Sequence, residues 1–117
     1  MEKTILNREA VLAAQDVQRE YVDVPEWNGG VYVQTISARA GLEMVSRRSE
    51  ADEKNQAVVG IELILAQTVV DEAGNLLFNA EDLPALMDKS RTAIDRIVAA
   101  AMRLNKMGTW AEDTEKN

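Results

Sequence analysis

The side chains that most often carry enzyme chemistry are scarce in this chain of 117 residues. It contains no cysteine and no histidine. Thiol nucleophiles, disulfides, zinc sites of the usual kind and imidazole acid–base catalysis are therefore excluded. Carboxylates and glycines remain as the groups whose spacing could indicate a reaction or a ligand.

Three groups have such a spacing. Asp71, Glu72 and Asn75 surround Gly74 as in a calcium loop, but the further ligands and the closing bidentate glutamate of the twelve-residue pattern are missing. The pair Glu81-Asp82 could exchange protons, yet it falls in the first turn of a predicted helix, where acidic residues favour the helix dipole. Gly29-Gly30 is not followed by the Gly-Lys-Ser/Thr of a phosphate loop. We predict no catalytic, cofactor or metal residues, and hence not an enzyme.

The charge pattern argues against nucleic-acid and membrane partners. The formal net charge is -7, from 20 acidic and 13 basic residues, and the acidic excess is spread along the chain. Nucleic acids and anionic membranes are bound by clustered lysine and arginine, which this pattern lacks. The N-terminus has no apolar signal-peptide core, and the longest apolar stretch, 58–70, is too short and too polar to span a bilayer. Together with the absence of cysteine, this is compatible with the cytoplasm.

The aromatic residues are the remaining candidates for function, by binding a protein partner. Tyr21, Trp27 and Tyr32 cluster on a predicted hairpin, and Trp110 is the one large apolar residue of the C-terminal tail. Aromatic residues are enriched at interface hot spots, although packing on the core is the more common role for aromatic residues of a hairpin. We treat Tyr21, Trp27, Tyr32 and Trp110 as candidate partner-binding residues.

The elements that would position these residues begin with the hairpin, predicted at 20–27 and 31–36. Its strands are rich in β-branched and aromatic residues, and Asn28-Gly29-Gly30 between them suits a tight turn with positive φ. Pro25 cannot donate a ladder hydrogen bond, which predicts an edge strand or a bulge.

Capping residues and apolar periodicity predict the helices. The expected ranges are 8–15, 38–50, 56–70, 80–88 and 91–106, with caps at Asn7, Ser37, Asn79 and Ser90 and a stop at Gly108. The segment 56–70 is apolar on nearly all sides, so we interpret it as a buried central helix, with strand as the alternative at its end. Residues 76–78 form a short extended piece that could pair with 68–70, and 47–55 could continue a helix or form a loop.

The predicted fold class is therefore α+β and mainly α-helical. An N-terminal helix and the β-hairpin are followed by about four helices in a single domain, 1–108. Residues 109–117 are expected to form a flexible acidic tail. Because the central segment is so apolar in such a small chain, we also expect a homo-oligomer.

The ordered series of local patterns resembles a known family. The segments AVLAAQD, VDVPEWNGGVYVQTISA, LAQTVVDEAGNLLFNAEDLPAL and DKSRTAIDRIVAAAMRLNKM occur in that order. They resemble the tail assembly chaperones of long, non-contractile-tailed bacteriophages and prophages, over about residues 10–117. The pattern is matched least well from 42 to 55.

This resemblance implies a function without a cofactor. Such proteins bind the tape-measure protein, keep it soluble and help recruit the tail-tube protein in the host cytoplasm. They self-associate and are not expected in the mature virion. The alternative interpretation is a small structural tail protein or head–tail connector of the virion.

The family also implies a minor, longer product made by ribosomal frameshifting. We therefore hypothesise that this chain is the short form, with a slippery run near the codons for 115–117. An acidic tail such as 109–117 could be extended without disturbing the core.

Overall fold

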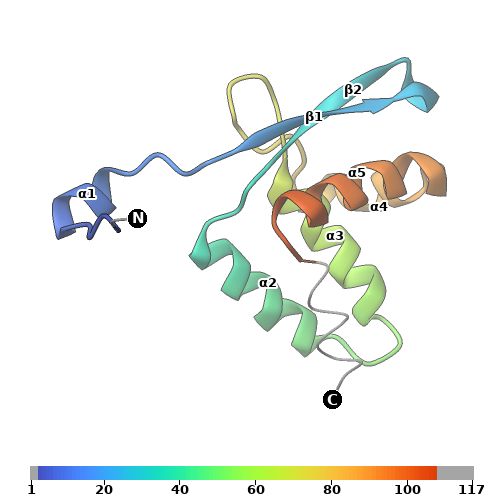
Figure 1. The fold of residues 1–117 in the computed structure, drawn as a ribbon. Helices are drawn as coiled ribbons and strands as arrows, with labels where there is room; N and C mark the ends of the chain where they lie inside the picture. The colour runs from blue at the N-terminus through green and yellow to red at the C-terminus, as the bar shows by residue number, and fades with distance from the viewer. Residues whose placement is uncertain (1–2, 108–117) are drawn as a thin grey trace.

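The computed structural model describes residues 3–107, and its elements confirm the predicted α+β, mainly helical architecture (Figure 1). The helices are α1 (Arg8–Ala13), α2 (Ala38–Glu50), α3 (Gln56–Thr68), α4 (Leu83–Met87) and α5 (Arg91–Leu104), and the strands are β1 (Arg19–Val24), β2 (Gly29–Gln34) and β3 (Val69–Val70). Two 3₁₀ turns, η1 (Pro25–Trp27) and η2 (Ala80–Asp82), complete the order. Within this part of the chain, no helix is long and apolar enough to cross a membrane.

The sheet has the order β1-β2-β3, and both pairings are antiparallel. The hairpin is confirmed and β1 is an edge strand, but both strands end earlier than predicted. Pro25 and Trp27 lie in the turn η1, because the loop takes four residues rather than three. The positive φ falls on Asn28, at 55°, and not on either glycine.

Gly30 is needed for a different reason from the predicted one. A Cβ atom at this position would collide with the Tyr21 hydroxyl and the Val22 carbonyl oxygen across the hairpin. Gly29, its neighbour, has nothing nearer to such an atom than the Trp27 carbonyl oxygen at 4.0 Å. The close approach of the two strands therefore selects glycine at position 30 only.

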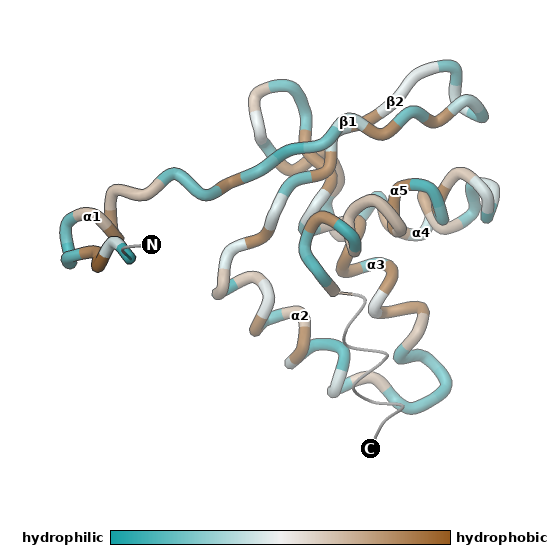
Figure 2. Tube along the Cα trace, viewed as in Figure 1, coloured by the Kyte–Doolittle hydropathy of each residue, from teal (hydrophilic) through white to brown (hydrophobic). Residues whose placement is uncertain are grey.

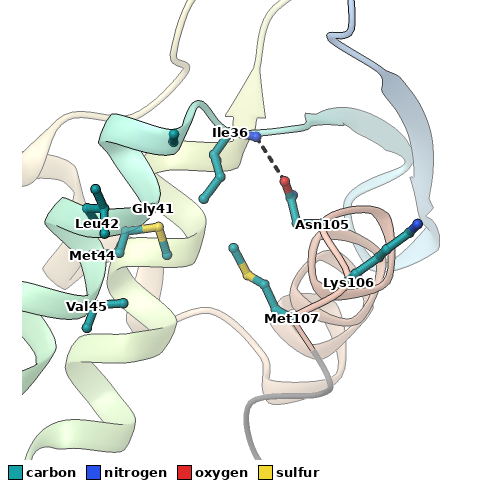
Figure 3. A pocket seen from close by; sticks show the side chains of 9 residues that line it. Ile36, Gly41, Leu42, Met44, Val45, Asn105, Lys106 and Met107 are labelled. Carbon is teal, nitrogen blue, oxygen red and sulfur yellow. Dashed lines mark hydrogen bonds between the residues drawn. The ribbon is translucent and has the colours of Figure 1, made fainter. Parts of the chain in front are cut away.

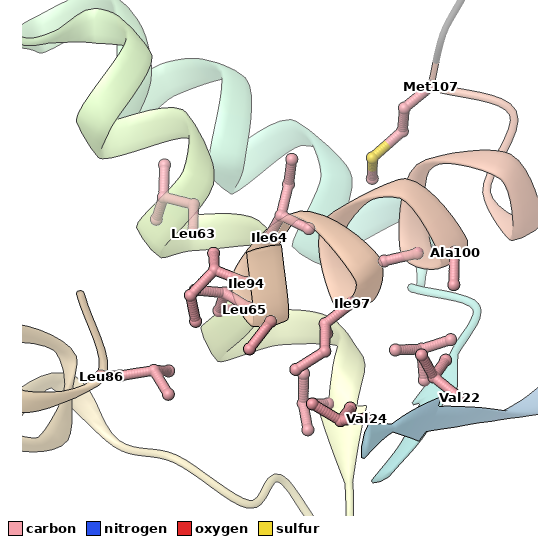
Figure 4. Close-up of a cluster of buried hydrophobic side chains, with 14 of the residues drawn as sticks. Val22, Val24, Leu63, Ile64, Leu65, Leu86, Ile94, Ile97, Ala100 and Met107 are labelled. Atoms are coloured by element: carbon pink, nitrogen blue, oxygen red, sulfur yellow. The ribbon is translucent and has the colours of Figure 1, made fainter. Parts of the chain in front are cut away.

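The core lies between one face of the sheet and the helices α3 and α5 (Figure 4). Alternate residues of the strands point inward, as the pleat requires, and the apolar stripe of α5 meets them. Residues with no measurable exposure come from every layer, and they are Val24, Val33, Leu65, Thr68, Val69, Ala93, Ile97 and Ala101.

The central helix and its strand-like end are both present. α3 passes into β3 without a loop, which reconciles the two interpretations of 56–70. Thr68 is fully buried, and its Oγ1 donates to the Ile64 carbonyl at 2.6 Å, so the hydroxyl is satisfied. The extended piece also pairs as predicted, since Leu76 bridges Val70 and the Leu77 amide donates to Val69.

The predicted capping residues act as such. The side chains of Asn7, Ser37, Asn79 and Ser90 each accept a backbone amide hydrogen bond at the start of a helical segment. α2 ends at Glu50 and leaves residues 51–55 as a loop, which decides between the two alternatives for that segment.

α5 ends earlier than the predicted stop, by a C-terminal motif that uses a non-glycine residue. Lys106 takes the left-handed conformation with φ 57°. Its amide donates to the Arg103 carbonyl, and the Met107 amide donates to the Met102 carbonyl, which is the Schellman pattern. Gly108 lies outside the described residues.

α1 stands apart from this body. It contains no buried residue, and residues 3–17 are exposed throughout. Figures 1 and 2 show it at the end of an extended segment, with several apolar residues and no element packed against it. We call residues 3–17 the N-terminal arm.

Candidate protein-binding surfaces

The acidic residues whose spacing could indicate a calcium site or acid–base chemistry have structural roles. Asp71 Oδ1 accepts the amides of Ala73 and Asn75 at 2.9 and 3.0 Å, which closes a turn. Asp82 accepts the Asn79 amide and forms a capping box with it. Among residues 3–107, no three histidine, cysteine, aspartate or glutamate side chains are grouped so that they could hold a metal ion.

The two tyrosines form a pair on the outer face of the hairpin. Tyr21 and Tyr32 are directly opposite in the register, and their rings meet edge to face with centroids 5.9 Å apart. The Arg19 guanidinium lies over the Tyr32 ring at 5.1 Å and donates to the Glu72 carbonyl at 2.9 Å. The side chain of Tyr21 remains exposed, whereas Tyr32 is half-buried. The pair thus offers an aromatic surface on the side of the sheet that faces away from the core.

Trp27 lies elsewhere, at the tip of the hairpin on the core side. It is half-buried and packs against the hydrophobic core. It also lines an apolar depression of about 360 Å³, which we call the Trp27 depression, formed with Val31, Leu77, Phe78, Leu86 and Lys89. The structure therefore separates Trp27 from the tyrosine pair, and the predicted single cluster becomes two surfaces. Trp110 lies outside the described residues.

A larger apolar groove runs between the start of α2 and the end of α5 (Figure 3). We call it the α2–α5 groove; its volume is about 520 Å³, and its lining includes Ile36, Gly41, Leu42, Met44, Val45 and Met107. The side chains of Met44 and Met107 close its floor, because both are buried, whereas Leu42 is 73% exposed.

Asn105 holds the two sides of this groove together. Its Oδ1 accepts the Ile36 amide at 2.9 Å, and its Nδ2 donates to the carbonyls of Ala101 at 3.0 Å and Gln34 at 3.4 Å. One side chain thus fixes the junction between β2 and α2 against the end of α5.

Sequence reasoning did not identify the α2–α5 groove. The pattern that predicts the helix 38–50 includes Leu42 and Val45, but helical periodicity does not show whether another element covers its apolar side. Gly41 lies in the same helix, and its missing side chain opens the groove. Met107 is both buried and part of the lining.

Two ion pairs attach α5 to the hairpin. Arg96 Nε contacts both carboxylate oxygens of Glu26, at 3.0 and 3.1 Å, and Arg103 contacts Glu20 at 2.7 Å. The pKa of Glu26 is lowered from its ordinary 4.5, first by a hydrogen bond from its own backbone amide and then by Arg96. These contacts join the hairpin, whose tip carries Trp27, to α5.

Comparisons with known proteins agree with this architecture. A family model described as "Phage tail assembly chaperone" matches residues 6–117. Among solved structures, the chain is similar to the tail assembly chaperone of bacteriophage HK97, with a TM-score of 0.58 and 18% identity over 82% of this chain and 90% of that chain. At that identity the likeness concerns the fold. No curated protein matches the chain.

Proposed function

The chain belongs to the phage tail assembly chaperone family, and from this premise we propose that it binds the tape-measure protein, keeps it soluble and helps recruit the tail-tube protein. The observation that carries this proposal is the Trp27 depression, an apolar surface with an aromatic rim at the hairpin tip. A long helical client exposes apolar side chains until its own assembly buries them. The Trp27 depression is suited to covering such apolar side chains temporarily.

The proposed role is binding and not catalysis. The carboxylates with a suggestive spacing are engaged in capping and turn hydrogen bonds, and the two concave surfaces are lined mainly by apolar side chains. We place the action in the host cytoplasm, where tail proteins are made, and expect the chaperone to leave before the virion is complete. Tyr21 and Tyr32 provide a second, outward-facing surface for a partner such as the tail-tube protein.

Co-expression with the tape-measure protein of the same phage or prophage tests the proposal. Leu77 lies on the rim of the Trp27 depression and is 42% exposed, so Leu77→Glu adds a charge there without removing a core side chain. We expect the parent chain to hold the tape-measure protein in the soluble fraction and to co-purify with it, and Leu77→Glu to lose most of both effects.

The matched control is Val58→Glu, on α3, which adds the same charge at a valine of similar exposure that lines neither concave surface. It should behave like the parent. If the parent chain neither solubilised nor captured the tape-measure protein, the proposed function would be wrong. Copies retained in finished particles would favour a structural tail or connector protein instead.

A further inference from the structure

The two walls of the Trp27 depression come from separate parts of the chain. The hairpin supplies Trp27 and Val31, and the segment 77–89 supplies the other lining residues, which are Leu77, Phe78, Leu86 and Lys89. The second wall is anchored in the body, because Leu86 is buried in the hydrophobic core. The width of the depression therefore depends on where the hairpin tip lies relative to this wall.

The hairpin tip extends beyond the three-stranded part of the sheet. Within residues 3–107, β2 pairs with β3 only at Tyr32 and Val33, so the end of β2 from Gly29 to Val31 has β1 as its one neighbouring strand. Two-stranded ribbons twist more strongly than larger sheets and are marginally stable alone. At this end η1 lies against α5, which Figure 1 shows below the hairpin. Holding Trp27 in one place therefore depends on contacts between the tip and α5.

Arg96 on α5 provides such a contact. Its Nε lies 3.0 and 3.1 Å from the two carboxylate oxygens of Glu26. Glu26 directly precedes Trp27 in η1, a three-residue turn that starts at Pro25 and is closed by the Asn28 amide, which donates to the Pro25 carbonyl. A short closed turn that begins with proline leaves little backbone freedom between its residues. The position of the Glu26 carboxylate therefore constrains that of Trp27.

From these observations we infer that Glu26 and Arg96 are positioning residues for client binding, because their contact sets the place of Trp27 and with it the width of the Trp27 depression. The inference rests on the proposed function and names the residues that keep the client site in its binding shape. Since the pair is partly solvated, it adds little to the stability of the fold. Its loss should change the site more than the stability.

A second ion pair offers a matched control. Arg103 lies about two turns after Arg96 on α5 and contacts Glu20 at 2.7 Å. Both pairs join α5 to the hairpin, and both are partly exposed. Glu20, however, lies opposite Val33, in the three-stranded part of the sheet and away from Trp27. Breaking this pair should leave the Trp27 depression unchanged.

The fluorescence of Trp27 reports its position in the free protein. The chain has two tryptophans, so Trp110→Phe makes Trp27 the one emitter. In this background Arg96→Gln, Arg96→Lys and Arg103→Gln are compared by emission maximum and by acrylamide quenching. Circular dichroism melts establish that each variant is folded. The co-expression test with the tape-measure protein uses the same substitutions with Trp110 kept in place.

We expect Arg96→Gln to shift the Trp27 emission to longer wavelength and to raise its quenching, because the released tip exposes the indole to water. The same variant should co-purify roughly fivefold less tape-measure protein than the parent, or lower still. Arg96→Lys keeps the charge but loses the Nε donor, so it should lie between the parent and Arg96→Gln. Arg103→Gln should match the parent in emission and in capture.

A double-mutant cycle separates the pair from the other contacts of each residue. Glu26→Gln alone should shift the Trp27 emission as Arg96→Gln does. The double variant should shift it no further, because the two side chains act through one contact. Additive shifts would show that each side chain acts by itself and would refute the inference.

Three further results would overturn the inference. The first is an unchanged Trp27 emission in folded Arg96→Gln. The second is an equal shift in Arg103→Gln, which would indicate a general loosening of the hairpin. The third is a shifted emission with undiminished capture, since client binding would then not depend on the place of Trp27. If the parent captured no tape-measure protein, the proposed function would fail, whereas the emission of the free chain would still decide whether the pair positions Trp27.

Discussion

At the scale of single residues, the hairpin depends on one glycine rather than two. At Gly30 the Tyr21 side chain and the Val22 carbonyl oxygen occupy the space that a Cβ atom would need. Gly30→Val should therefore lower the free energy of unfolding by about 1–3 kcal/mol, the usual range for overpacking. Urea denaturation followed by circular dichroism measures this change.

Gly29→Val is the matched control, because its φ is not positive and its Cβ has open space. It should change the free energy of unfolding by less than about 0.5 kcal/mol, as surface substitutions usually do. Equal losses at both positions would mean that both glycines are required for their backbone conformation, as the sequence alone suggested.

Asn105 is the second single residue on which we expect the stability of the fold to depend. Asn105→Leu would leave the Ile36 amide and the Gln34 carbonyl without this partner at a half-buried junction. We expect a loss of about 1–3 kcal/mol in the free energy of unfolding, the cost of unsatisfied buried polar groups.

Asn105→Asp keeps the acceptor for the Ile36 amide and should lose less than the leucine variant in the same denaturation experiment. If the two variants unfolded at the same urea concentration, the hydrogen bond to Ile36 would not be the important one.

At the scale of elements, the lowered pKa of Glu26, caused first by the hydrogen bond from its own backbone amide and then by Arg96, gives the contact between hairpin tip and α5 a pH dependence. Because the pKa of Glu26 is lowered in the folded state, its contribution to stability is present above its ordinary pKa of 4.5. That contribution is lost as the pH falls below this value towards the lowered pKa. Glu26→Gln should therefore flatten the decline in melting temperature on acidification below pH 4.5.

Measuring the two melting temperatures at neutral and acidic pH checks this prediction. Because the pair is partly solvated, the difference should be small and should shrink further in high salt. A Glu26→Gln variant whose acid profile is steeper than that of the parent would contradict the assignment.

The sequence predicted those elements well whose boundaries are decided by residues close together in the chain. Caps at Asn7, Ser37 and Ser90 fixed three helix starts, because a side chain and an amide three residues on decide them. The end of α5 was missed, since Lys106 adopts a conformation for which sequence reasoning expected glycine. The separation of Trp27 from the two tyrosines was missed for another reason. The face on which Trp27 lies depends on the turn, and a loop of four residues places Trp27 outside the strand.

At the scale of the whole molecule, the core residues within the described range 3–107 run from Val22 to Met107. Deleting the tail 109–117 should therefore leave the melting temperature and the self-association unchanged. Circular dichroism and sedimentation of the truncated chain test this. Loss of the folded state would place Trp110 in the core and contradict the domain boundary expected from the sequence.

The same boundary bears on the hypothesis of a longer frameshifted product. An extension attached after residue 117 would start beyond this core, so a fused chain should fold as the short form does. The gene should then show a heptanucleotide slip site near its end, followed by an overlapping reading frame. A gene without such a site would refute the hypothesis, whatever the truncation shows.

The exposed arm also has a consequence for how the sequence can change over evolutionary time. No side chain of residues 3–17 is buried against the rest of residues 3–107, so the folding of this part of the chain places almost no constraint on them. Related chains should accordingly show faster sequence change in the arm than at the core positions such as Val24, Leu65 and Ile97.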